Sequence, residues 1–436
     1  MKRLVFFILL TFWALPVRAE IAIQEITSPG GISAWLVEEH SIPFMALEIR
    51  FKGGASLEAE GKRGAINLMT GLLEEGAGEL DARAFAEARE SLAASYSFDV
   101  NDDTLRISAQ FLSENRDQAV GLLKLALNAP RFDPDAIERV RGQVISHLRS
   151  RETDPDAIAG ATFDALAFPG HPYGEYYGGT IEGVSTLTRD DIVDAYQRTI
   201  ARDRLYVSAV GDITAQELGA LLDTLLGELP ATGAPQPGHV QYALGPGVTV
   251  VDFDTPQSVV QFGQPGIRRD DPDYLVAYVL NTILGGGNFN ARLMDELREK
   301  RGLTYGVRTY LVPMFLGEQI VGVFSSSNDK VAEAIEIVRE EWEKIASQGV
   351  SAEELAAAKT YLTGAYPLRF DGNGPIARIM IGMQLIGQPT SYIGERNELI
   401  EAITLEEINR VAARIYQPEA LHFVVVGRPV GVQGSD

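Results

Sequence analysis

An internal repeat with a constant offset runs through this chain. Thr188 heads a helical pattern, and the strand pattern that follows it ends at Gly211. Thr404 and Gly427 occupy the same places in a second pattern, each 216 positions later. A register that holds across a helix cap, a helix and a strand is typical of a duplicated domain and not of a short repeat unit.

Other segments extend the repeat. The alternating strand patterns at 46–51 and 259–262 are each followed by an apolar helical pattern. Later in each copy, Asp133 and Ser351 head helices as candidate N-caps. Strands and long helices are mixed without regular βαβ alternation. We therefore expect an α+β fold of two homologous domains, each an antiparallel sheet backed by helices.

A proline-rich stretch separates the two copies. Between 229 and 247 the chain holds Pro230, Pro235, Pro237 and Pro246 among glycines and alanines. This composition is typical of an extended linker. The predicted organisation is a signal peptide at 1–19, an N-terminal domain at 20–228, a linker at 229–247 and a C-terminal domain at 248–436.

The first nineteen residues predict a secretory signal. Two basic residues precede an apolar run at 4–15, and Val17 and Ala19 are small residues at the positions that signal peptidase reads. The run is too short to span a bilayer as a stable helix. We therefore expect cleavage before Glu20 and a periplasmic chain that no membrane holds. Because the chain has no cysteine, it has no lipid-bearing cysteine and no thiol nucleophile.

The charge balance excludes some classes of partner. There are 38 basic and 60 acidic residues, a formal net charge of −22. Such a surface repels nucleic acid and anionic lipid. It attracts cationic peptides, although an acidic surface also serves solubility alone.

Several catalytic arrangements are missing from the sequence. The histidines are His40, His147, His171, His239 and His422. No two of them lie within one helical turn, so no helix presents two histidines to zinc. There is no G-x-S-x-G elbow, and the glycine run at 285–287 lacks the spacing of a dinucleotide-binding loop.

Three stretches resemble the pitrilysin family, which includes insulin-degrading enzyme and the mitochondrial processing peptidases. Residues 284–305 read LGGGNFNARLMDELREKRGLTY, similar to the second-half signature of that family. Residues 168–174 read FPGHPYG, and residues 64–76 read GAINLMTGLLEEG. The last stretch resembles the active-site helix of the first half. The resemblance covers nearly all of the mature chain and implies one half of a clamshell.

The chain departs from the family at the metal site. Active members carry an inverted zinc motif, His-x-x-Glu-His, in which the histidines bind zinc and the glutamate activates water. Those positions hold Asn67, Thr70 and Gly71 here, and the third ligand position falls at or near His147. Glycine has no ligand atom, and threonine cannot act as a general base near neutral pH. The resemblance therefore implies a degenerate site without a metal.

The resemblance also implies which functional residues remain. Arg298 and Tyr305 match an arginine and a tyrosine that, in family members, bind the substrate backbone and the developing oxyanion. From the sequence we expect Arg298 near the end of a helix, at the margin of its apolar stripe. We expect Tyr305 in an alternating strand. Both residue types suit the role, because guanidinium and phenol groups donate hydrogen bonds to oxygen.

The expected function follows from this retained pair. The chain is predicted to be the non-catalytic, substrate-binding subunit of a heterodimeric zinc peptidase. It would supply Arg298 and Tyr305 to the zinc site of a homologous subunit. Peptides are the expected substrates, with zinc in the partner and no cofactor in this chain. Two alternatives remain: a purely structural or peptide-capturing protein, and an enzyme with a cryptic site, for which no residue cluster stands out.

Overall fold

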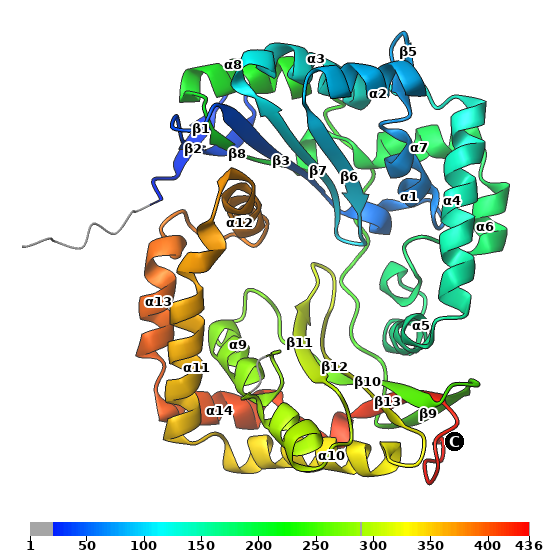
Figure 1. Cartoon of the computed structure of the whole chain (residues 1–436), viewed down its shortest axis with the longest axis vertical. Helices are drawn as coiled ribbons and strands as arrows, with labels where there is room; N and C mark the ends of the chain where they lie inside the picture. Colours follow the sequence, from blue (N-terminus) through cyan, green and yellow to red (C-terminus); the bar gives the residue numbers. More distant parts are fainter. Residues whose placement is uncertain (1–20, 288–289, 436) are drawn as a thin grey trace, which may run out of the picture.

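Two mixed β-sheets face each other in the computed structural model, which describes residues 21–287 and 290–435 (Figure 1). The first is a 6-stranded sheet of order β1-β2-β8-β3-β7-β6. Its strands are β1 (Gln24–Thr27), β2 (Ser33–Glu38), β3 (Phe44–Lys52), β6 (Ser95–Val100), β7 (Thr104–Leu112) and β8 (Leu205–Gly211). The second is a 5-stranded sheet of order β11-β12-β10-β13-β9. Its strands are β9 (Gly247–Asp252), β10 (Gln257–Pro265), β11 (Val307–Pro313), β12 (Glu318–Ser327) and β13 (His422–Gly427).

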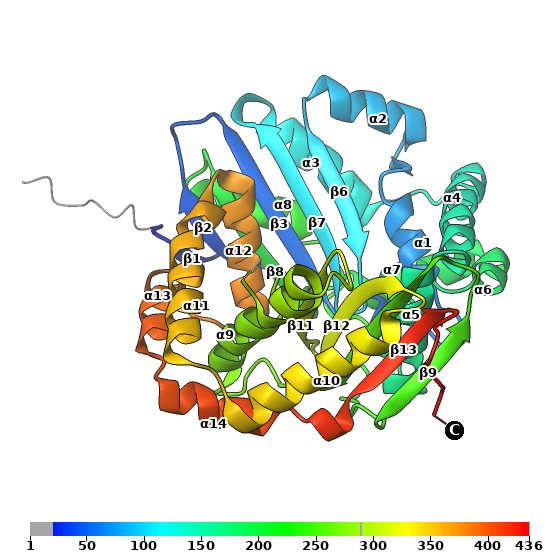
Figure 2. The ribbon, with the colours of Figure 1, turned by 60° about the horizontal axis from the view of Figure 1, so that its bottom comes forward.

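Helices cover the outer faces of both sheets and connect them along the sides. The first half contains α1 (Ala65–Leu72), α2 (Ala82–Ser91), α3 (Arg116–Asn128), α4 (Pro134–Glu152), α5 (Pro155–Ala167), α6 (Ile181–Thr186), α7 (Arg189–Thr199) and α8 (Ala215–Leu226), with a two-residue hairpin of β4 (Gly76–Ala77) and β5 (Leu80–Asp81). The second contains α9 (Tyr274–Leu284), α10 (Val331–Gln348), α11 (Ala352–Ala365), α12 (Asn373–Leu385), α13 (Tyr392–Ala402) and α14 (Leu405–Ile415). Figure 2 shows α10 and α14 outside the second sheet.

The two sheets repeat one topology, as the duplication predicts. When the first sheet is followed from β6 and the second from β11, the strands occur in the same order and run in the same directions. Each sheet has one parallel pair, β2 with β8 and β9 with β13. The expected sheets are therefore antiparallel except at these pairs. Thr188 and Thr404 cap α7 and α14. The side-chain oxygen of each accepts a hydrogen bond from the backbone N–H of the residue three positions later. The predicted cap at Asp133 forms no such bond, because its carboxylate accepts from Arg131 Nε at 2.7 Å.

One helix of each half packs on the opposite sheet. Helix α5 of the first half lies against β10 and β13, and α12 of the second half lies against β3 and β8 (Figure 1). Ser208 on β8 donates to the Ala377 carbonyl of α12 at 2.7 Å. On the other side, Phe163 of α5 packs over Gly263, where a β-carbon would lie 2.7 Å from the ring. Because each half contributes a helix to the sheet of the other half, two buried hydrophobic clusters join the halves.

The arrangement is the expected half of a clamshell, with a hollow between the sheets. Within residues 21–287 and 290–435, no helix has the length and apolarity needed to cross a bilayer. The signal peptide predicted at 1–19 lies outside the described residues. The predicted domain boundaries stay predictions. The segment between Leu229 and Pro246 holds no strand or helix, in keeping with the composition on which the linker was predicted.

Candidate functional site: a degenerate metal centre and an exposed arginine–tyrosine pair

Helix α1 places the three degenerate zinc-motif residues in different environments. Asn67 is half-buried, and Thr70 is buried at 2 % exposure. The Thr70 hydroxyl donates to the Ile66 carbonyl one turn back, at 2.7 Å. Because that hydroxyl bonds within its own helix, Thr70 contributes to helix packing and has no group that activates water.

Gly71 lies where α1 meets α4. A β-carbon at position 71 would lie 3.0 Å from Val140 Cγ1, closer than ordinary van der Waals contact. Val140 is itself buried, at 4 % exposure. Helix α4 therefore occupies part of the space that a histidine at position 71 would need.

His147 shares one small depression with Asn67. This depression of 250 Å³ also contains Gln143 and Tyr176. His147 is exposed, and its Nε2 lies 3.1 Å from the Tyr176 hydroxyl. The structure thus brings two of the four predicted degenerate positions together, while Thr70 and Gly71 are not part of the lining.

The donor set of this depression does not fit zinc. Protein zinc sites use thiolate, imidazole and carboxylate donors, typically at least three of them. Among the described residues, no group of three or more His, Cys, Asp or Glu side chains is placed to hold a metal ion. The depression offers one imidazole, hydrogen-bonded to a phenol, and the two amide side chains of Asn67 and Gln143, and this set does not fit zinc.

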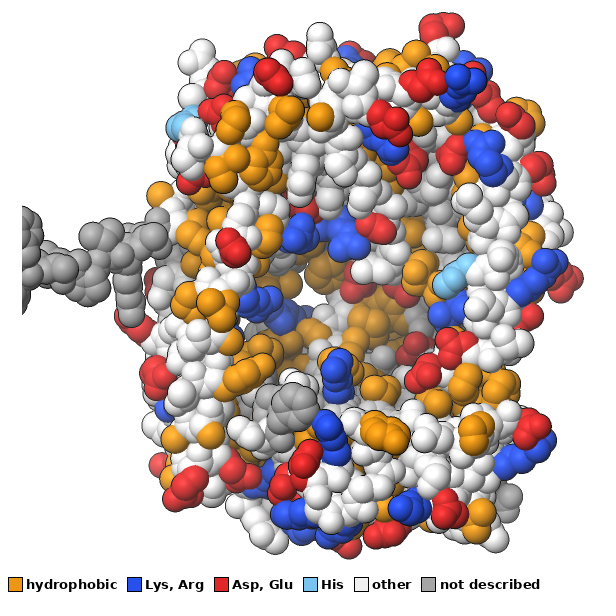
Figure 3. Space-filling view, in the orientation of Figure 1, with side chains coloured by type: hydrophobic (Ala, Val, Ile, Leu, Met, Phe, Trp, Pro, Cys, Tyr) orange, Lys and Arg blue, Asp and Glu red, His pale blue; other side chains and the backbone are white. Residues whose placement is uncertain are grey.

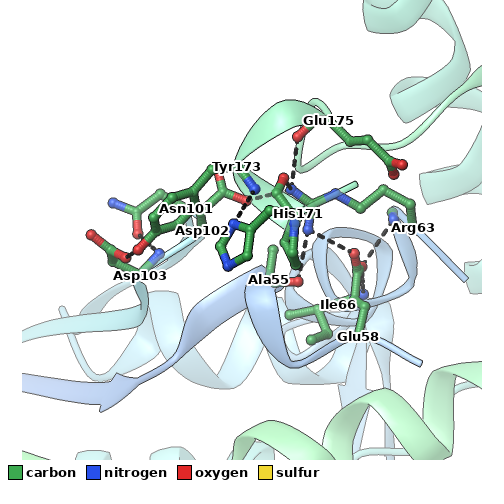
Figure 4. A network of polar contacts seen from close by, with 12 residues as sticks. Ala55, Glu58, Arg63, Ile66, Asn101, Asp102, Asp103, His171, Tyr173 and Glu175 are labelled. Carbon is green, nitrogen blue, oxygen red and sulfur yellow. Dashed lines mark hydrogen bonds and ion pairs between the residues drawn. The ribbon is translucent and has the colours of Figure 1, made fainter. Parts of the chain in front are cut away.

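Helix α1 is fixed at its start by ionic contacts instead. The Glu58 carboxylate accepts from the backbone N–H of Gly64 at 2.9 Å and of Ile66 at 2.8 Å, so it caps the helix (Figure 4). Arg63 forms ion pairs with Glu58, at 3.2 Å, and with Asp102. Its guanidinium also donates to the carbonyls of Ala55, Pro172 and Glu175. One arginine therefore ties α1 to the β6–β7 turn and to the segment around 172–175.

The same network continues into the second half of the chain. The Tyr173 hydroxyl donates to Asp103 and accepts from the backbone N–H of Leu316 at 3.0 Å. The second Asp103 oxygen accepts from the N–H of Phe315 at 3.3 Å. The tip of the β11–β12 hairpin is thereby bonded to the β6–β7 turn. The anchoring contacts of α1 and the contacts between the halves form one continuous system.

Burial sets the ionisation of the acids in this region. It raises the pKa of Glu58 to about 7, although Arg63 and the backbone N–H groups oppose the shift. It also raises the pKa values of Asp102 and Asp103 above their usual range. On α5, burial raises the pKa of Asp164 to about 6, while a hydrogen bond from Gln319 acts in the opposite direction. The junction is therefore less stable when these acids are ionised.

Arg298 lies in a short π-helical segment, Met294–Lys300. Leu297 beside it is buried, and the Arg298 side chain is 38 % exposed, which matches the predicted place at the margin of the apolar stripe. Its Nε lies 3.4 Å from the Glu299 carboxylate. The π-helical winding was not predicted, and such segments are frequent at functional sites.

Tyr305 differs from its predicted setting. The expectation that it lies in a strand is wrong, because β11 begins at Val307 and Tyr305 belongs to the preceding connection. Leu303 and Val307, which the alternating pattern places on the same face as Tyr305, are buried, whereas the Tyr305 side chain is 88 % exposed. Neither Arg298 nor Tyr305 lines the depression that holds Asn67 and His147. Their predicted roles stay predictions.

Sequence reasoning missed the anchoring residues Arg63, Asp103 and Tyr173. Arg63 and Asp103 belong to none of the motifs found in the sequence, and Tyr173 lies only within the family stretch at 168–174. Their charge and ring type gave no signal, because arginine and aspartate are usually exposed. Only contacts between segments far apart in the sequence reveal their role.

Comparison with known proteins identifies the relatives of this chain. Residues 186–362 match the family described as Peptidase M16 inactive domain. The chain is 29 % identical to the non-peptidase homolog YmxG of Helicobacter pylori, over 89 % of this chain and 90 % of the relative. It is 26 % identical to an uncharacterized zinc protease of Mycobacterium leprae, over 89 % of this chain and 88 % of that protein.

The solved structures agree. A peptidase M16 inactive domain from Pseudomonas fluorescens superposes with a TM-score of 0.87 at 25 % identity, covering 95 % of this chain and 100 % of the other. The resemblance inferred from residues 284–305 is thus confirmed. The named relatives include both a non-peptidase and a zinc protease, so similarity to them does not decide whether this chain is catalytic. That question depends on the residues at 67, 70 and 71.

Proposed function

We propose that this chain, of which residues 186–362 match the Peptidase M16 inactive domain, is the substrate-binding, non-catalytic subunit of a two-subunit zinc peptidase. A homologous chain with an intact His-x-x-Glu-His motif would bring the metal. The proposed compartment is the periplasm, on the strength of the predicted signal at 1–19.

The exposure of Tyr305 carries this proposal. A tyrosine ring that is 88 % exposed contributes almost no burial energy to the fold. An exposed ring with a hydroxyl donor, close in sequence to an arginine, suits contact with another molecule. The buried residues on either side, Leu303 and Val307, fix the connection from which the ring projects.

The proposed chemistry assigns one task to each side chain. The Tyr305 hydroxyl donates a hydrogen bond to the carbonyl oxygen as it gains negative charge during attack. The Arg298 guanidinium donates to backbone carbonyls of the peptide and holds it in register. Neither residue activates water. The pair therefore accelerates hydrolysis only when a second subunit supplies the nucleophile.

Co-expression with a zinc-bearing homologue tests the proposal. The partner sought is a similar-sized exported chain with the intact motif, encoded next to this one. The two should copurify and hydrolyse peptides, and Tyr305→Phe should lower kcat by roughly 10²–10³-fold. Tyr310→Phe on β11, also exposed at 43 %, is the matched control and should keep full activity.

The alternatives give different results. If the two chains run separately at micromolar concentration, the structural or peptide-capturing function is favoured. If the complex is active and Tyr305→Phe retains full turnover, the pair does not act on the reaction. If Tyr305→Phe abolishes copurification, the tyrosine is part of the subunit interface.

A further inference from the structure

A large cavity lies between the two halves of the chain, and it shares Asp103 and Phe315 with the network described above. It encloses 1250 Å³, more than the roughly 300–1,000 Å³ of a typical small-molecule pocket. One face of α12 lines it, together with parts of α9 and α13 and the turns that follow β6 and β11. Neither Arg298 nor Tyr305 is part of this lining.

Three exposed arginines line this cavity without a close carboxylate partner. The guanidinium of Arg269 lies over the Tyr274 ring, 4.3 Å from its centroid. Arg369 makes no ion pair with any residue that the structure describes. Arg378 approaches Glu48 only to 3.9 Å. Figure 3 shows Lys and Arg side chains gathered beside the central hollow.

The Glu48 carboxylate near Arg378 has closer partners on its other oxygen, Oε2. It pairs with Arg50 at 2.8 Å and accepts from Ser108 at 2.8 Å. Arg378 therefore adds little to the neutralisation of Glu48. Its side chain is 48 % exposed and keeps most of its donors for another anion.

The acids that line the cavity are mostly bound to other groups. Asp270 pairs with Arg268 at 2.9 Å, and Asp271 pairs with Arg414 at 2.8 Å. Asp103 accepts from Tyr173 and from backbone N–H. Glu395 on α13 is the one remaining acid of the lining. Four arginines, Arg269, Arg369, Arg378 and the buried Arg396, line the cavity beside these four acids. Because Arg268 and Arg414, which lie outside the lining, neutralise Asp270 and Asp271, positive charge is in excess there, in a chain of net charge −22.

Aromatic side chains form much of the remaining wall. Tyr274, Tyr278, Tyr366, Tyr392 and Phe315 all line the cavity. Such walls lower the local dielectric and concentrate the field of the arginines. A guanidinium held over a ring, as Arg269 is over Tyr274, can still donate its N–H groups to a planar anion.

We propose that this cavity binds the carboxylate groups of acidic peptides, with Arg369 and Arg378 as the principal ligands and Arg269 on its tyrosine as a third. The choice of a peptide carboxylate over another anion rests on the proposed function. A carboxylate matches the planar fork of arginine, and aromatic walls accommodate the adjoining peptide. The carboxylate comes from a free C-terminus or from Asp and Glu side chains.

Peptide binding by the isolated mature chain tests this site. Fluorescence anisotropy would compare one labelled peptide in three forms: a free C-terminus with internal Glu, a C-terminal amide, and an amide with Glu replaced by Gln. Affinity should fall across the series and should weaken as salt rises. Amidation removes the C-terminal carboxylate, and the change of Glu to Gln removes the side-chain carboxylate. The change that costs more affinity identifies the carboxylate that the cavity binds. Equal affinity for all three forms overturns the inference.

Variants assign the effect to the arginines. Arg369→Gln and Arg378→Gln should each weaken binding of the acidic form about tenfold or more. The fully amidated form should bind the variants and the parent chain alike. Arg202→Gln, an exposed arginine outside the cavity, is the control and should change nothing. If a variant lost the same factor of affinity for the acidic and the fully amidated peptide, the arginines would not recognise the negative charge of the peptide.

This test is independent of the two-subunit proposal. Acidic peptides that bind the lone chain, with no activity in any complex, would support the site and refute the peptidase role. A complex whose activity depends on Tyr305 but which binds amidated and acidic peptides equally would support the peptidase role and refute the carboxylate site. Displacement of the peptide by inorganic phosphate at far lower concentration than by acetate would assign the cavity to phosphate and overturn the inference.

Discussion

Val140 Cγ1 on α4 lies 3.0 Å from the place that a β-carbon on Gly71 of α1 would take. Val140 thus crowds the position at which the family resemblance implies a lost zinc ligand. A larger side chain at position 71 therefore requires the Val140 side chain to shift, and close packing makes such a shift costly.

A histidine at position 71 is therefore expected to destabilise the fold. Gly71→His should lower the free energy of unfolding by about 1–3 kcal/mol, through overpacking against Val140. Val140→Ala in the same chain should recover part of that loss, and urea unfolding of the two single variants and the double variant measures the coupling. Gly142→His, at an exposed helical glycine on α4 with open space around it, should be neutral or stabilising.

The Arg63 network should be a large stabilising element. Arg63→Gln leaves buried Glu58 and Asp102 without their cation, at a cost of about 3–5 kcal/mol at pH 8. Because burial places the pKa of Glu58 at about 7, protonation should reduce this loss at pH 5.5. Arg83→Gln, which breaks an exposed pair with Glu87, should cost less than about 0.5 kcal/mol. A loss equally small at Arg63 would contradict the anchoring role.

Asp164 should make the junction between the halves sensitive to pH. Its pKa in the folded chain, about 6, lies above the usual value of 3.8 for an aspartate, because burial disfavours the charged form. Its stabilising contribution is therefore complete below pH 3.8 and is lost as the pH rises through 6. The stability of the parent chain relative to Asp164→Asn should fall by about 1 kcal/mol between pH 5 and pH 7.5.

The variant also predicts a gain at neutral pH. Asp164→Asn keeps an acceptor for Gln319 and cannot ionise, so it should be more stable than the parent by about 1–3 kcal/mol at pH 7.5. Urea unfolding at both pH values measures this difference. Asp117→Asn, at a side chain that is 90 % exposed, is the control. A gain that is the same at pH 5 and 7.5 would show that ionisation is not the cause.

Arg298 should affect substrate binding more than turnover in the proposed complex. Arg298→Ala removes charged hydrogen bonds to the peptide, each contributing about 1.5–3 kcal/mol, so KM should rise about tenfold or more. Arg298→Lys should recover only part, because an ammonium lacks the planar fork. Steady-state kinetics and size analysis measure both effects. Unchanged KM with lost subunit association would assign Arg298 to the interface.

Short-range signals in the sequence determined much of the fold. The offset between Thr188 and Thr404 gave the duplication, and both residues cap helices as expected. The apolar alternation at 303–307 was correct only in part, because Leu303 and Val307 are buried whereas Tyr305, predicted on the same face, is exposed. Helix caps, periodicity and glycine turns depend on neighbours within a few positions, so one chain displays them without its tertiary structure.

Tertiary structure alone decided how those elements meet. No local sequence pattern indicates that α5 and α12 each pack on the sheet of the other half, or that Val140 lies against Gly71. None indicates that Arg369 and Arg378 line one cavity while nearby acids pair with other groups. These relationships join segments that are tens to hundreds of positions apart. Burial, charge pairing and steric closure at such sites depend on distances in space, and the sequence pattern around each residue does not encode those distances.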